Sequence, residues 1–149
     1  MDSPFYTFEV LEDAYRFTFN SVGRNGVIPK IIIYSKTDLP DYYNLALGDV
    51  RTDGTLDVFS KSNNGDMEKI LATVIQTLMV FLAYHPEANV FFAGSTPTRT
   101  RLYQIVLNKE IDKVDSTLKV LGLYEDYLEP FEPNKNYEGF VVSKKKSNI

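Results

Sequence analysis

The residues best suited to chemistry lie in the sequence GSTPTRTR, which spans residues 94–101. Its candidate ligand-binding residues are Gly94, Ser95, Thr96, Thr98, Arg99 and Arg101. An apolar segment precedes the glycine, and Pro97 stands where the first residue of a helix is favoured. Free N–H groups at a helix start and guanidinium groups both bind anions. The sequence therefore predicts a strand, a turn and a helix that together accept a phosphate or a carboxylate.

A helical projection separates the two arginines of this stretch. If the buried face consists of Leu102, Ile105 and Val106, Arg99 falls inside that face and Arg101 falls at its flank. A buried arginine must be paired, because an isolated charge in an apolar interior is costly. We therefore expect a structural ion pair for Arg99 and a ligand contact for Arg101.

A second polar cluster, SNNGD, spans residues 62–66. Asn63, Asn64 and Asp66 could line a pocket with amide and carboxylate groups, but turn formation and helix capping explain the same residues. We favour the turn, with Asn64 or Asp66 as the N-cap of the following helix. Asp66 is also the candidate partner of Arg99, which would join the two helix starts.

Other catalytic arrangements find little support in the residues. The single histidine, His85, precedes a proline at a helix end, where a favourable dipole contact accounts for it. The absence of cysteine excludes disulfides, thiolate metal sites and thiol catalysis. The turn at Gly94 is not a Walker-type loop, since it lacks the Gly-Lys-Ser/Thr ending. We expect no catalytic residue, no metal ligand and no cofactor, while an enzyme of unknown class stays open as a third alternative.

The elements that position these residues follow from hydrophobic periodicity. The predicted strands cover residues 6–10, 15–20, 27–35, 42–50, 55–60, 89–93, 118–122 and 137–143, and the predicted helices cover residues 67–83 and 97–108. The apolar run Ile31–Ile33 suggests a central strand covered on both faces. The fold class is α+β: an N-terminal antiparallel β-meander with a long helix packed across it, then β-α-β-β.

The aromatic strand residues allow two interpretations. Tyr15, Phe17 and Phe19, with Tyr42 and Tyr43, could form a platform on which single-stranded bases stack. Alternation at period two is also what a sheet core shows, and we favour the core.

Length and charge bound the class of protein. The 149 residues fit a single α+β domain, residues 1–149, and the basic end at residues 144–149 is expected to fray. The net charge is −4, with seven basic and eleven acidic side chains in residues 1–85 and nine of each in the remainder. This balance argues against a general nucleic-acid surface and leaves room for a local patch. Without a signal peptide or an uninterrupted membrane helix, we expect a cytoplasmic protein that does not bind membranes.

The motifs SNNGD and GSTPTRTRLY, together with YNL at residues 43–45 and LATV at residues 71–74, resemble a family of short bacterial proteins. The resemblance covers nearly the whole chain and implies one compact domain, with no activity, cofactor or catalytic residue attached. The four strands and long helix of the first half are more weakly similar to the unit of PC4- and Whirly-type binders of single-stranded nucleic acid. The β-α-β-β order of the second half departs from that plan.

Two functional interpretations are favoured over the third, an enzyme of unknown class. The first is a non-enzymatic binding protein whose Gly94–Arg101 turn accepts an anion, either a nucleic-acid phosphate or a carboxylate of another protein. The second is a protein-interaction or regulatory module that uses the aromatic, acidic segment Tyr124–Phe131. The second interpretation predicts self-association, for instance as a homodimer, or an exposed apolar patch larger than a few hundred Å².

Overall fold

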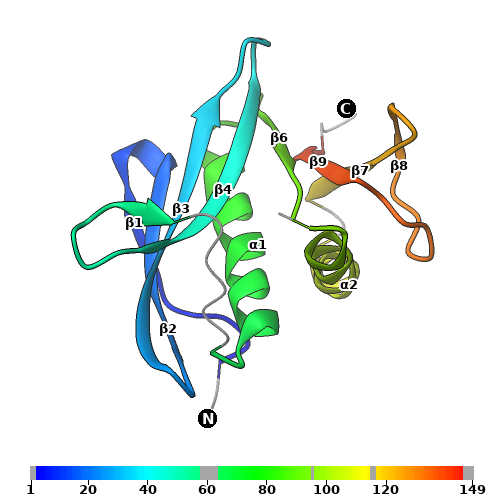
Figure 1. Ribbon diagram of the computed structural model, residues 1–149. Helices are drawn as coiled ribbons and strands as arrows, with labels where there is room; N and C mark the ends of the chain where they lie inside the picture. The colour runs from blue at the N-terminus through cyan, green and yellow to red at the C-terminus, as the bar shows by residue number, and fades with distance from the viewer. Residues whose placement is uncertain (1–2, 58–63, 95, 115–116, 146–149) are drawn as a thin grey trace.

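The computed structural model describes residues 3–57, 64–94, 96–114 and 117–145 of the chain (Figure 1). These residues form the following strands: β1 Glu9–Leu11, β2 Arg16–Gly23, β3 Gly26–Lys36, β4 Tyr42–Val50, β5 Leu56–Asp57, β6 Asn89–Phe92, β7 Leu118–Tyr124, β8 Tyr127–Pro130 and β9 Gly139–Lys144. They also form two α-helices, α1 Met67–Tyr84 and α2 Pro97–Val114. The fold class is α+β, as predicted.

One twisted sheet contains all the described strands. Its order is β1-β2-β3-β4-β6-β9-β7-β8, and β5 pairs with β4 beside this path. The pairing of β4 with β6 is parallel, and the other pairs are antiparallel. The predicted N-terminal meander is confirmed, because β2, β3 and β4 are neighbours both in the chain and in the sheet.

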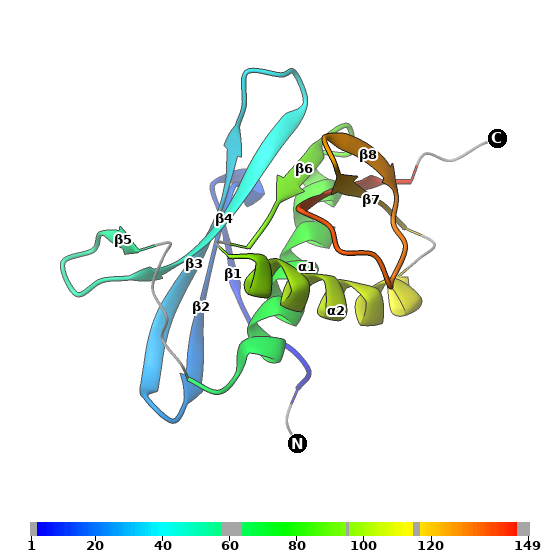
Figure 2. The same cartoon turned by 45° about the vertical axis from the view of Figure 1, so that its right-hand side comes forward.

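The core forms where α1 lies against one side of β2–β4, and α2 packs beside α1 and against β6 (Figure 2). Phe17, Ile32 and Phe81 are fully buried there, and the Phe81 ring stacks on Tyr34 with the ring centroids 4.2 Å apart. The expectation that β3 is covered on both faces is wrong. Ile32 is buried, but Ile31 and Ile33 are half-buried, because no helix among the described residues covers the opposite face.

Of the aromatic strand residues, Phe17 and Phe19 belong to the core, as favoured, and Tyr15 and Tyr43 pack against it. Phe17 and Phe19 of β2 are 0% and 5% exposed. The N-terminal segment covers them, since the rings of Phe8 and Tyr6 lie 5.5 and 5.6 Å from those of Phe17 and Phe19, respectively. A nucleic-acid base therefore cannot stack on the rings of Phe17 and Phe19.

Strand β8 has no counterpart among the predicted elements. It forms a hairpin with β7 through Glu125 and Asp126, both of which have positive φ, at 48° and 69°. Two-residue hairpin turns of this kind usually contain glycine or asparagine, and this one contains neither. The sequence therefore lacked the glycine or asparagine that would have predicted a hairpin turn here.

Helix α2 differs in length from the prediction. Helix α2 continues past the expected end near Asn108 to Val114, because residues 109–114 contain neither glycine nor proline to stop it. Of the predicted strand over residues 55–60, the structure describes Leu56–Asp57 as β5, and residues 58–60 lie outside the described residues.

Helix α1 is long and apolar enough, by length and composition alone, to cross a membrane. Of this segment, 56% is buried inside the protein, as in a core helix. Its buried residues include Val74, Leu78 and Phe81, each with no exposed surface. The apolar composition of α1 is thus explained by its packing against the sheet.

Candidate anion-binding site

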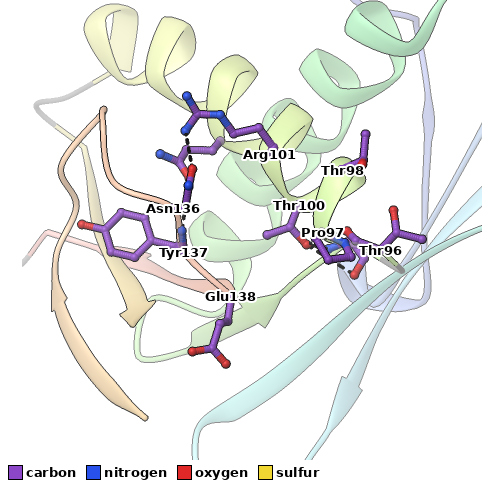
Figure 3. A pocket seen from close by; sticks show the side chains of 10 residues that line it. Thr96, Pro97, Thr98, Thr100, Arg101, Asn136, Tyr137 and Glu138 are labelled. Carbon is purple, nitrogen blue, oxygen red and sulfur yellow. Dashed lines mark hydrogen bonds between the residues drawn. The ribbon is translucent and has the colours of Figure 1, made fainter. Parts of the chain in front are cut away.

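The predicted anion-binding turn lines a pocket of about 720 Å³ at the start of α2 (Figure 3). We call it the α2 pocket; its lining residues are Gly94, Thr96, Pro97, Thr98, Thr100, Arg101, Gln104, Asn136, Tyr137 and Glu138. Four of the predicted ligand residues are among them: Gly94, Thr96, Thr98 and Arg101. Ser95 and Asn63 lie outside the described residues.

The turn between β6 and α2 is held by hydroxyl groups. The Thr96 hydroxyl accepts a hydrogen bond from the Arg99 N–H at 3.2 Å, so Thr96 caps the helix as expected of a hydroxyl residue there. The buried Thr100 hydroxyl accepts the N–H of Gly94 at 3.0 Å. Thr98 is the second helical residue, and its N–H therefore has no intrahelical partner. The helix start presents partial positive charge to the pocket.

Arg101 is the cation of the α2 pocket. Its Nη1 donates a hydrogen bond to Asn136 Oδ1 at 3.0 Å. Among the described residues, no carboxylate lies within ion-pair distance of Arg101. The first turn of α2 also contains no acidic residue. Arg101 thus has a neutral partner that orients the guanidinium and leaves its charge uncompensated.

A buried glutamine of α2 fixes the opposite wall of the pocket. Gln104 is 1% exposed, and its Nε2 donates to the carbonyl oxygens of Pro133, at 3.0 Å, and of Lys135. Its Oε1 accepts the Tyr137 N–H at 3.5 Å. The side chain thereby links α2 to the loop before β9 and places Asn136 opposite Arg101.

An ion pair connects the loop before β9 to strand β8. Lys135 Nζ lies 2.9 Å from both carboxylate oxygens of Glu129, and the Tyr137 hydroxyl donates to the same carboxylate at 3.1 Å. The ammonium group lowers the pKa of Glu129 below its usual value, and the carboxylate raises the pKa of Lys135. Both charged forms are therefore favoured at neutral pH, and the loop is tied to β8.

The structure corrects the helical projection of α2. Of the three residues assigned to the buried face, Val106 is buried as predicted, but Leu102 and Ile105 are 37% and 46% exposed. Thr100 and Gln104 are buried instead. The projection failed because it placed apolar side chains inside, whereas these two polar side chains are buried by bonding to backbone groups. Arg99 is half-buried and does not line the α2 pocket.

Asp66 also differs from the expectation. It occupies the N-cap position of α1 without making a capping hydrogen bond, and its carboxylate instead accepts the hydroxyls of Tyr6 and Ser21. Glu68, in the first turn of α1, forms an ion pair with Lys109 of α2. Lys109 follows Arg99 by ten residues, about 15 Å along a helix, so the two helix starts do not meet.

Asn64 has a structural role, in line with the favoured interpretation of SNNGD. It is 4% exposed, and its amide donates to the Ser21 hydroxyl and the Gly26 carbonyl, both at 3.0 Å. Its Oδ1 accepts the Asn25 N–H at 2.6 Å. These bonds tie the β2–β3 hairpin to the start of α1, away from the α2 pocket.

The remaining chemical candidates lie elsewhere. His85 Nε2 is 2.8 Å from the Asp13 carbonyl oxygen, and the ring lies 4.5 Å from that of Tyr15. It does not line the α2 pocket. Within the described part of the chain, no group of three or more His, Asp or Glu side chains is arranged to hold a metal ion.

The lining residues missed by sequence reasoning are Gln104, Asn136, Tyr137 and Glu138, besides Pro97 and Thr100 of the turn itself. The first four gave no local signal, because a glutamine within a helix and polar residues in a loop are typical of a solvent-exposed surface. Their role depends on the contact between α2 and a loop about 30 residues later.

A family model described as a family of unknown function, DUF6934, matches residues 2–145. Because the match spans nearly the whole chain, the protein belongs to this family. No curated protein and no solved structure matches the chain. The description of the family names no function, so the chemistry of the α2 pocket is the guide to function.

Proposed function

We propose that this member of the family is a binding protein that holds an anionic group in the α2 pocket. The single observation that supports the proposal is the state of Arg101, which borders a pocket of about 720 Å³ while bonded to an amide instead of a carboxylate. A guanidinium oriented by one neutral partner keeps further donors for a phosphate or a carboxylate. The hydroxyl-bearing turn and the start of α2 add donors to the same pocket, on the other side of α2 from the guanidinium, which extends toward Asn136 (Figure 3).

A single anionic group suits this pocket better than a nucleic-acid strand. Binding to a phosphate backbone relies on several cations, and the lining residues contain one arginine and one glutamate. The net charge of −4 also disfavours a polyanion. The weak similarity of the first half to PC4- and Whirly-type binders keeps an oligonucleotide as a comparison ligand in the test.

Replacing Arg101 with glutamine is expected to weaken phosphate binding at least tenfold, because the glutamine retains hydrogen bonding but not the charge. A tenfold loss corresponds to about 1.4 kcal/mol of binding free energy. Titration of the 15N-labelled protein with inorganic phosphate, followed by NMR, measures the affinity and shows whether the shifts centre on Thr98 and Arg101.

The matched control is Arg16→Gln, which removes the same charge from an exposed arginine that pairs with Glu12. We expect it to bind phosphate as the unchanged protein does. An equal loss of phosphate affinity in the two variants would show that the effect is general electrostatic attraction, and it would overturn the assignment of the α2 pocket as the binding site. A single-stranded oligonucleotide that binds more tightly than phosphate, with affinity falling steeply as salt rises, would favour the nucleic-acid alternative.

The protein-interaction alternative has one observation in its favour. Strand β8 is the last strand of the sheet, and Tyr127 on it is 77% exposed. An edge strand with an exposed aromatic ring is a suitable contact for another chain. If β8 mediates self-association, sedimentation velocity will show a dimer, and Tyr127→Ser will weaken it at least tenfold. A monomer at all accessible concentrations would exclude a homodimer through β8.

A further inference from the structure

We infer that the α2 pocket takes a small dipolar molecule, whose anionic group meets Arg101 and whose cationic group meets Glu138. This inference rests on the proposed function and extends it from an anion to a class of ligand. The observation behind it is that opposite charges line one pocket without pairing with each other. Among the described residues, no ion pair joins Arg101 to Glu138.

The two charged side chains lie at opposite ends of the set of lining residues (Figure 3). Arg101 extends toward Asn136, while the Glu138 side chain points away from it, beyond Tyr137. Glu138 Oε1 accepts the N–H of Glu125 at 3.1 Å, which holds the carboxylate in place. A carboxylate has about four acceptor sites on two oxygens, so this single bond leaves acceptors for a ligand.

The spacing of these groups limits the size of the ligand. Asn136, which bonds Arg101, and Glu138 are two residues apart, so their Cα atoms are separated by at most about 7 Å. The two charged side chains diverge from there (Figure 3), so a ligand that meets both must carry its charges at the two ends of a pocket of about 720 Å³. A phosphate diester strand would bring further negative charge toward Glu138, which the carboxylate opposes.

The charge pattern also predicts discrimination between anions. A ligand with only an anionic group must be held near an uncompensated carboxylate. A ligand that carries an ammonium group as well replaces this repulsion by a charge-assisted hydrogen bond. Glu138 therefore acts as a specificity determinant, whereas Arg101 supplies the attraction shared by all anions.

The test compares two phosphate monoesters of nearly equal size: phosphoethanolamine, which carries an ammonium group, and ethyl phosphate, which does not. NMR titration of the unchanged protein is expected to show at least tenfold tighter binding of phosphoethanolamine. Glu138→Gln should abolish that preference and leave the affinity for ethyl phosphate equal or higher. Glutamine keeps an Oε1 acceptor for the Glu125 N–H, so the variant preserves the local hydrogen bond.

Glu132→Gln is the control, because Glu132 is an exposed acid of the same loop that does not line the pocket. It should keep the preference for phosphoethanolamine. If both esters bind through Arg101 with equal affinity, the dipolar ligand is overturned while the anion site stands. If neither ester nor inorganic phosphate binds, the proposed function itself fails.

Discussion

Gly94→Ala is expected to lower the free energy of unfolding by about 3 kcal/mol or more and to abolish phosphate binding. A Cβ atom on Gly94 would lie 2.4 Å from the backbone nitrogen of Thr100 and 2.6 Å from the carbonyl carbon of Arg99. Neither atom belongs to a flexible side chain, so the first turn of α2 would have to move away from β6. That movement would break the bond from the Gly94 N–H to the Thr100 hydroxyl and displace the donors that face the ligand.

Urea denaturation and the phosphate titration measure the two effects. Gly54→Ala is the matched control, because Gly54 has a φ of +86° but no atom within 4 Å of an added Cβ. The control should lose only about 1–2 kcal/mol, from the left-handed backbone conformation, and should bind phosphate normally. A Gly94 variant no less stable than the Gly54 variant would contradict the close approach of β6 and α2.

Gln104→Leu is expected to destabilise the protein by about 3 kcal/mol. Leucine has a similar size but cannot bond, so it leaves the buried Tyr137 N–H and the part-buried carbonyls of Pro133 and Lys135 without their partner, at about 1–3 kcal/mol for a fully unsatisfied buried group. Release of the loop should also weaken phosphate binding, because Asn136 would no longer orient Arg101. Urea denaturation measures the stability, and Gln76→Leu, at a half-buried position of α1, should change it by no more than about 0.5 kcal/mol.

Gln104→Glu adds a pH dependence to the same test. The buried carboxylate would face two carbonyl oxygens, and only its protonated form can donate to one of them, so its pKa in the folded state must rise above the unfolded value of about 4.3. Relative to the unchanged protein, the variant is therefore expected to be most stable below pH 4 and to lose stability as the pH rises beyond 4.3. A stability difference independent of pH would show that Gln104 is not enclosed by the loop.

The case of Asp66 shows how tertiary contacts override a local preference. Its position before α1 is typical of an N-cap, but its carboxylate is taken by the hydroxyl groups of Tyr6 and Ser21. Burial and the bond to Asp66 both raise the pKa of Tyr6, which keeps the phenol protonated as the donor. No local pattern could have revealed this pairing, since Tyr6 lies 60 residues before Asp66 in the chain.

The sequence by itself determined the features that depend on neighbouring residues. Hydrophobic periods of two and 3.6 predicted the α+β class and the main strands and helices, while GSTPTRTR predicted a capped helix start with Arg101 at its flank.

The tertiary structure decided which residues lie opposite that helix start. The loop before β9 supplies Asn136 and Glu138, and Gln104 holds the loop in place. These partners are about 30 residues apart, and they meet only because β7, β8 and β9 fold back beside α2. The physical reason is that periodicity and capping arise within one or two turns of chain, whereas the charge and shape of a pocket depend on groups brought together by packing.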